Sequence, residues 1–227
     1  MISTKLDFEE RKEEIENYIR FLKIFDDDET KIHYIENKET VQEGIQNQFQ
    51  TILIANAFLI LYNLIESTIR NTIIAIYKSI FIRGESYGTL TTKLKQIWIK
   101  QETANLNGST FRLDTMHDNI YEIAERIING EPLMFSNESL DISGNIDAQK
   151  IRDIAKKIGF EPSPNGRNLL IIKNKRNRLA HGEQTFYTVG RDFSVKDIDG
   201  FKEEVFNYLT AVMDEVDEFI SKKGYIN

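Results

Sequence analysis

The strongest constraint on the fold is one long helical pattern, from about Thr40 to Phe81, whose second half is densely apolar. Polar residues recur inside its most apolar part, residues 52–82, at Asn56, Asn63, Glu66, Arg70 and Asn71. Such side chains are expensive at the centre of a bilayer, so the pattern predicts a helix buried inside a protein and not a membrane span. Gly84 and Gly88 predict its end.

The rest of the chain also carries helical patterns and few residues that break helices. Only three prolines and twelve glycines occur in 227 residues. We predict helices over residues 6–25, 91–106, 115–128, 145–158 and 167–181, and a last one from Ser194 to Gly224. After the break at residues 26–28, a second amphipathic piece runs through Ile32 and Ile35.

Several residues predict where these helices begin and end. Asn145 can cap one helix, and Gly159 stands where a C′ glycine belongs. Ser194, three residues before Asp197, resembles a capping box. The resulting prediction is an all-α bundle that forms a single domain over residues 1–227. Residues 83–145 are predicted to be an irregular and helical insertion between the core helices.

The composition excludes several kinds of site. Without cysteine, the chain has no disulfide, no thiolate zinc site and no cysteine nucleophile. His33, His117 and His181 lie far apart in the sequence and lack metal-ligand spacing. A glycine-rich phosphate loop is also missing, which argues against P-loop and Rossmann enzymes. We therefore expect neither a metal nor a cofactor. The N-terminus does not resemble a secretory signal, and we expect a cytoplasmic protein.

Charge is distributed unevenly along the chain, whose net charge is −7. Residues 1–43 hold thirteen acidic and seven basic residues, whereas residues 167–181 hold five basic residues and no acidic one. The overall charge argues against a general binder of duplex phosphate. The basic segment suits a local contact with a polyanion, although charge alone favours the simpler interpretation of a solvated helix face.

The basic helix ends in a stretch that combines two chemically useful residues, Arg176 and His181, in the string Arg-Asn-Arg-Leu-Ala-His-Gly. Arginine can stabilise a phosphorane-like transition state, and histidine can transfer protons. One side of the helical wheel holds Leu169, Ile172, Arg176, Leu179 and Ala180, and a second side holds Asn174, Asn177 and His181. Lys175 and Arg178 point away from both sides and are predicted to be solvated.

Because Arg176 shares the apolar side, it is expected to have a partner. A polar seam on the long apolar helix, formed by Asn56, Asn63, Glu66, Ser67 and Arg70, offers one. Glu66 and Arg70 can pair with each other at i, i+4. Alternatively, Glu66 orients Arg176 or His181 across the helix packing. A further interpretation is purely structural, with Arg176 as an ion-pair residue and His181 as a polar helix cap.

The arginine, the asparagine after it and the histidine resemble the signature of the HEPN superfamily (higher eukaryotes and prokaryotes nucleotide-binding). The wider context is similar to one bacterial group of HEPN-like nucleases: residues 176–183, Phe186, residues 190–192, 61–66 and 144–148. The resemblance implies a helical bundle, commonly a homodimer in which two motif helices form one composite site. It also implies a metal-independent endoribonuclease, often a toxin or an anti-phage defence effector with an antitoxin or defence-system partner.

The chemistry implied by the resemblance uses the 2′-hydroxyl of RNA as the nucleophile. His181 would deprotonate this hydroxyl or protonate the leaving 5′-oxygen, Arg176 would pair with the non-bridging oxygens, and Asn177 would position the phosphate or the imidazole. Glu66 and Asn63 are the expected orienting residues. The expected RNA-binding cations are Lys173, Lys175 and Arg178.

Two alternatives to an enzyme remain open. Some HEPN proteins have lost catalysis and serve as RNA-binding, nucleotide-binding or dimerising adaptor modules. A purely structural interaction protein is the other alternative.

Overall fold

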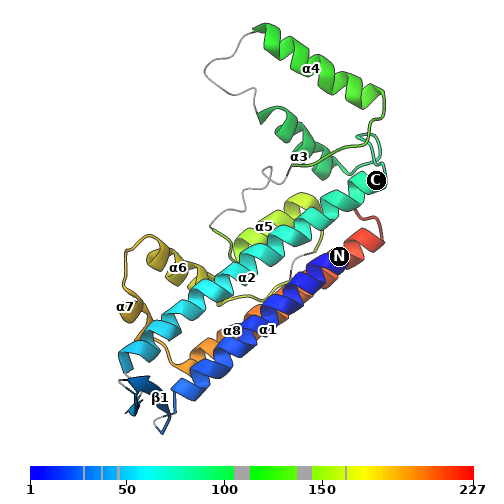
Figure 1. Ribbon diagram of the computed structural model, residues 1–227. Coiled ribbons are helices and arrows are strands. Elements are labelled where there is room, and N and C mark those ends of the chain that lie inside the picture. The colour runs from blue at the N-terminus through cyan, green and yellow to red at the C-terminus, as the bar shows by residue number, and fades with distance from the viewer. Residues whose placement is uncertain (28, 37, 45–46, 105–112, 137–144, 162) are drawn as a thin grey trace.

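The computed structural model describes residues 1–27, 29–36, 38–44, 47–104, 113–136, 145–161 and 163–227. These residues form eight helices and one two-stranded sheet, which confirms the mostly α-helical fold (Figure 1). The elements are α1 (Ile2–Phe25), β1 (Lys31–Glu36), β2 (Glu39–Gly44), α2 (Asn47–Ile82), α3 (Thr92–Glu102), α4 (Leu113–Ile128), α5 (Ala148–Ile158), α6 (Leu169–Ala180), α7 (Phe186–Gly190) and α8 (Val195–Ser221).

Three long helices, α1, α2 and α8, lie side by side and form the core of the bundle (Figure 1). Helix α1 runs antiparallel to α8, because Lys5 near its start pairs with Asp217 at 2.8 Å and Lys23 near its end pairs with Asp199 at 2.8 Å. Helix α2 contributes more buried residues than any other described helix, including Phe58, Leu61, Tyr62, Ile65, Ile76 and Ile80, all fully buried. Burying side chains of this size drives folding by about 1.5–3 kcal/mol each.

Helix α2 is long and apolar enough to cross a membrane by length and composition alone. However, 56% of its most apolar window is buried inside the protein, as expected for the central helix of a bundle. Helices α1, α6, α7 and α8 pack against it. The helix begins at Asn47 and not at Thr40, because residues 39–44 belong to strand β2.

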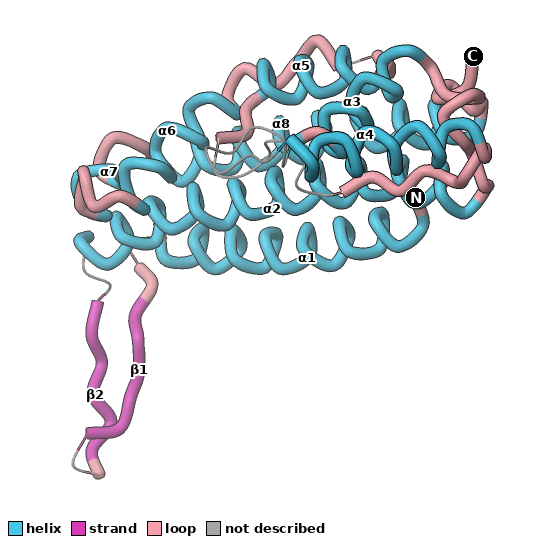
Figure 2. Tube along the Cα trace, turned by 90° about the horizontal axis from the view of Figure 1, so that it is seen from above, coloured by secondary structure: helices cyan, strands magenta, loops and turns pink. Residues whose placement is uncertain are grey.

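The amphipathic piece predicted through Ile32 and Ile35 is a β-hairpin. Strands β1 and β2 pair antiparallel, with Tyr34 opposite Val41, and the hairpin projects away from the bundle (Figure 2). Isoleucine and tyrosine alternate with polar residues in this segment, and β-branched and aromatic side chains favour strands. The strand period of two is carried by Ile32 and Tyr34, whereas Ile35, three residues after Ile32, lies on the opposite face of β1.

The helix boundaries agree with the sequence at some ends and differ at others. Ser194 and Asp197 form the predicted capping box, and Gly159 adopts the left-handed conformation with φ 113°. Helix α5 is capped by Asp147, whose side chain accepts from the Lys150 amide at 2.9 Å, and not by Asn145. An aspartate with extended backbone satisfies the first turn better than the residue two positions earlier.

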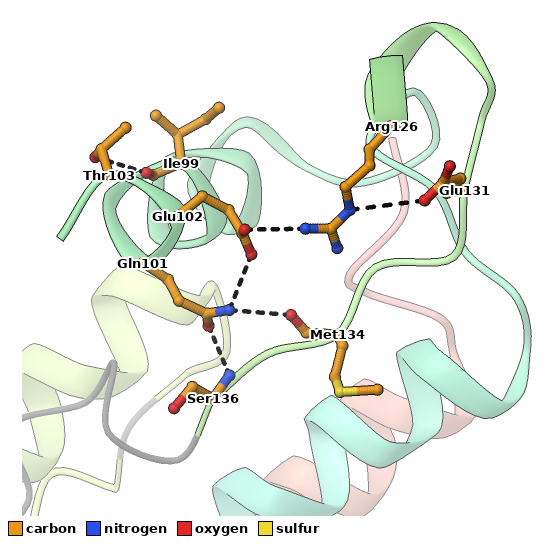
Figure 3. Close-up of polar contacts among 8 residues, drawn as sticks. All are labelled: Ile99, Gln101, Glu102, Thr103, Arg126, Glu131, Met134 and Ser136. Atoms are coloured by element: carbon orange, nitrogen blue, oxygen red, sulfur yellow. Dashed lines mark hydrogen bonds and ion pairs between the residues drawn. The ribbon is translucent and has the colours of Figure 1, made fainter. Parts of the chain in front are cut away.

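The described parts of the predicted insertion, residues 83–145, pack onto one end of the bundle. The Thr91 amide donates to the Tyr225 carbonyl at 2.9 Å, and Trp98 of α3 is fully buried. Figure 3 shows the polar contacts that join α3 and α4, among them the ion pair of Arg126 with Glu102 at 2.9 Å. The side-chain oxygen of Gln101 accepts a hydrogen bond from the backbone amide of Ser136 and so holds the segment that follows α4. Residues 105–112 and 137–144 of the predicted insertion lie outside the described residues.

Candidate functional site

Three groups hold the guanidinium of Arg176 on the face of α6 that packs against α2. Its central carbon lies 3.6 Å from the centroid of the Tyr62 ring, which is the distance of a close cation–π stack. One nitrogen donates to Glu66 Oε2 at 3.1 Å and another donates to Asn177 Oδ1 at 2.9 Å. Only 17% of the side chain is exposed. The prediction that this arginine needs a partner is met by contacts to its own chain.

Glu66 bridges two arginines, so both pairings considered for it occur together. While Oε2 accepts from Arg176, Oε1 accepts from Arg70 at 2.9 Å. The two arginines and one glutamate leave a net charge of +1. Since the Arg70 side chain is 49% exposed and that of Arg176 only 17%, most of the accessible positive charge belongs to Arg70.

The segment that leads into α5 closes over the same arginine. The Ile146 amide donates to the Tyr62 hydroxyl at 3.1 Å, and the Asn177 amide nitrogen donates to Asn145 Oδ1 at 3.4 Å. Burial raises the pKa of Tyr62, which keeps its hydroxyl protonated at neutral pH. Tyr62 and Asn145 therefore contact the residues of the site, although the sequence analysis gave Tyr62 no role and considered Asn145 only as a helix cap. Tyr62 is one helical turn before Glu66, which is the signal that could have identified it.

His181 stands at the end of α6 and faces solvent. Its backbone amide closes the last turn by donating to the Asn177 carbonyl at 2.9 Å, and Gly182 follows with φ 69°. The residue is exposed, and within the described residues no hydrogen bond or ion pair holds the imidazole. A substrate can reach the exposed imidazole of His181. It can reach Arg176 only at the edge of the guanidinium that Tyr62, Glu66 and Asn177 leave uncovered.

Two of the three cations expected to bind RNA are engaged within the chain. Lys173 pairs with Asp147 at 2.5 Å, with exposed side-chain fractions of 16% and 13%. Lys175 pairs with Asp192 at 3.3 Å and is only 17% exposed, so the prediction that it is solvated is wrong. Its ammonium nitrogen lies 5.1 Å from the centroid of the Phe193 ring, within the range of a cation–π contact.

The remaining predicted residues of this face lie at the surface. Arg178 is exposed and lies 3.4 Å from the Gln184 side chain. Asn63 is exposed on α2, one residue after Tyr62. Ala180 is exposed as well, because α6 ends there and the apolar side of the wheel is not covered to its last turn.

The described residues contain no group of three or more histidine, aspartate or glutamate side chains that could hold a metal ion.

A helical bundle with Arg176, Asn177 and His181 at the end of one helix, and a core-helix glutamate behind the arginine, defines a HEPN-type domain. The family model HEPN_MAE_28990-like HEPN matches residues 3–225, and the chain belongs to this family. Searches of curated proteins and of solved structures gave no match to the chain. Membership of this family suggests a nuclease or an RNA-binding module.

Proposed function

We propose that the protein is a metal-independent endoribonuclease that cleaves RNA through attack by the 2′-hydroxyl. The observation that carries this proposal is the presence, at the end of one helix, of a solvent-facing His181 and of an arginine whose orientation is fixed by Glu66 and Tyr62. Catalysis by electrostatic stabilisation requires such preorganised donors, and proton transfer requires an imidazole that the substrate can reach.

In the proposed reaction His181 accepts the proton of the 2′-hydroxyl. The 2′-oxygen then forms a bond to phosphorus and the bond from phosphorus to the 5′-oxygen breaks, which leaves a 2′,3′-cyclic phosphate and a 5′-hydroxyl. An acid then donates a proton to the leaving 5′-oxygen. In the dimer, this acid is the second copy of His181. Arg176 and Asn177 donate to the non-bridging oxygens as their negative charge grows. The exposed Arg70 and Arg178 guide the RNA backbone to the site.

A homodimer through α6 is part of the proposal. The outward stripe of α6 carries Leu170 and Ile171, which are 48% and 36% exposed, together with the exposed Asn174 and Arg178. Packing two such stripes would cover apolar surface and bring the two His181 side chains near one axis. Ile171→Glu should then shift the protein towards monomer in sedimentation experiments. Ile82→Glu, an exposed isoleucine at the end of α2, is the matched control.

A second candidate is a non-catalytic RNA-binding module. The observation that favours it is the burial of Arg176, because Glu66 cancels part of its charge and its remaining exposure is 17%. A module of this kind binds RNA through Arg70 and Arg178 without cutting it, and His181→Ala leaves its binding unchanged.

The proposed chemistry fits a cytoplasmic toxin or anti-phage effector controlled by a protein partner. Expression of the wild-type chain is then expected to arrest bacterial growth, and His181→Ala is expected to relieve the arrest. If the wild type and His181→Ala are equally toxic, the proposed role as a toxin or effector that acts through His181 is contradicted.

The deciding experiment compares wild-type, Arg176→Ala and His181→Ala protein on RNA in EDTA. We expect cleavage by the wild type and loss of about two to four orders of magnitude in rate for His181→Ala, the usual contribution of a general acid–base group. His117→Ala, an exposed histidine on α4, serves as the matched control and should cleave normally. A requirement for magnesium, or cleavage that survives both site substitutions, contradicts the proposal.

A further inference from the structure

A hollow lies at the start of α6, at the opposite end of this helix from His181. It has a volume of about 790 Å³ and is bordered by the start of α6, by α5 and by α8. Small-molecule sites usually occupy roughly 300–1,000 Å³, so its size suits a metabolite. Among its lining residues are Arg152, Arg167 and Tyr208, which none of the proposed chemistry uses.

The two arginines supply positive charge to this hollow, and the lining carboxylate of Glu204, whose described partners are the neutral amides of Asn168, offsets only part of it. Within the described residues neither Arg152 nor Arg167 forms an ion pair. Arg152 donates to Gln149 Oε1 at 3.1 Å and to the Asn165 carbonyl at 3.5 Å, which fixes its guanidinium and leaves other N–H groups free.

The two carboxylates of the hollow already have partners. Asp147 is paired with Lys173, while Glu204 accepts from the Asn168 backbone amide at 2.9 Å and from its side-chain nitrogen at 2.6 Å. Glu204 thus occupies the start of α6, and an anion in the hollow would be bound by arginine side chains and not by the amides of that helix end.

Tyr208 provides an independent observation that points to a ligand in this hollow. The residue is only 2% exposed, and among the described residues its hydroxyl has no hydrogen-bond partner. Buried hydroxyls without partners are rare in native proteins. Burial raises the pKa of Tyr208 to about 12, so the hydroxyl stays protonated and is available as a donor. The charges of Arg152 and Asp147 also affect the pKa of Tyr208. All three residues line the hollow.

Gly166 lets the loop before α6 close against the same ring. Its φ is 97°, and a Cβ at this position would lie 2.8 Å from the Tyr208 ring. A larger residue would push the loop away from the ring and open the hollow on that side.

We propose that this hollow binds the phosphate group of a small molecule, held by Arg152 and Arg167 and by a hydrogen bond from Tyr208. Guanidinium groups match phosphate oxygens in bidentate geometry, and a neutral hydroxyl donor completes the set. The site is separate from the proposed cleavage site, and its existence does not depend on catalysis.

The hollow and the cleavage site nevertheless share one segment. Asp147 borders the hollow and caps α5, while its neighbour Ile146 binds Tyr62, on which Arg176 stacks. A phosphate in the hollow therefore lies near Asp147, the residue next to Ile146, whose backbone amide supports Arg176 through Tyr62.

The test measures binding of inorganic phosphate by calorimetry, at constant ionic strength against chloride. We compare the wild type with the double variant Arg152→Gln/Arg167→Gln, with Tyr208→Phe and with the control Arg20→Gln, an exposed arginine on α1. Loss of both guanidiniums should weaken binding at least about tenfold, and loss of the hydroxyl about fivefold. The control should bind as the wild type does.

Equal binding by all four proteins, or no binding by the wild type, overturns the proposal. Thermal unfolding without phosphate checks that the variants fold. Tyr208→Phe should unfold at the wild-type temperature or higher, because the change removes a hydroxyl that lacks a partner. A second arm uses a 2′-O-methyl oligoribonucleotide without terminal phosphate. If the same arginines bind this oligonucleotide and not inorganic phosphate, the phosphate belongs to RNA and the small-molecule proposal is wrong.

Discussion

The exchange Glu66→Gln tests the arrangement around Arg176 at almost constant side-chain shape. It removes the negative charge that both Arg70 and Arg176 use, while one amide oxygen can still accept a hydrogen bond. The side chains of Glu66 and Arg176 are 22% and 17% exposed, so solvent screens their pair only partly. A hydrogen bond between charged groups contributes about 1.5–3 kcal/mol, whereas an exposed pair such as that with Arg70 adds about 0–1 kcal/mol.

We therefore expect Glu66→Gln to lower the free energy of unfolding by about 2 kcal/mol. Urea denaturation followed by the fluorescence of Trp98 measures this change, because Trp98 is the only tryptophan and is fully buried. Glu218→Gln is the control: it breaks an exposed pair with Lys222 on α8 and should leave the unfolding curve unchanged.

A double-mutant cycle with Arg176→Gln then isolates the pair itself. The account predicts a coupling free energy of about 1 kcal/mol or more between Glu66 and Arg176. If Glu66→Gln is as mild as the control, or if the two substitutions add without coupling, the glutamate does not hold the arginine and the reasoning fails.

Two further predictions concern the scaffold. Gly190→Ala should destabilise the protein by about 3 kcal/mol or more, because its Cβ would lie 1.9 Å from a backbone oxygen of α2. In the same thermal melts Gly200→Ala, inside α8 and with nothing within 4 Å of its Cβ, should be neutral or stabilising by up to about 1 kcal/mol, and equal destabilisation by both would contradict this. Hydrogen bonds from Lys23 and Lys202 hold the pKa of Asp199 below its ordinary value of 3.8. The stability that Asp199 contributes is thus present above about pH 4 and lost as the pH falls through its lowered pKa, so the melting temperatures of the wild type and Asp199→Asn should converge towards about pH 3. A constant difference over that range would argue against the assignment.

Much of the bundle could be predicted because helical spacing and helix caps are local signals. Residues 52–82, the capping box of α8 and the glycine after α5 follow from sequence spacing and from the conformations that serine and glycine favour. The hairpin was missed because Ile32 and Ile35, three residues apart, fit a helical period, whereas in the strand they lie on opposite faces. Only the pairing of β1 with β2 distinguishes the two, and pairing is not a local property.

At the site, the helical wheel correctly predicted that Arg176 faces the packed side and needs a partner. It could not predict that Glu66 serves two arginines at once, nor that Tyr62 stacks on one of them, because both depend on how α6 crosses α2. Lys173 and Lys175 were expected to bind RNA because of the resemblance and because residues 167–181 hold no acidic residue, while their acidic partners Asp147 and Asp192 lie 26 and 17 positions away. Long-range ion pairs of this kind leave no periodic signal.

The most direct test of the account identifies the ends that the protein creates on RNA in EDTA. The proposed chemistry predicts a 2′,3′-cyclic phosphate and a 5′-hydroxyl, no cleavage where a single 2′-deoxynucleotide replaces the attacking ribose, and loss of these products in His181→Ala but not in His33→Ala. A 5′-phosphate with a free 3′-hydroxyl, or cleavage that continues at the 2′-deoxy position, would contradict attack by the 2′-hydroxyl and with it the role given to His181.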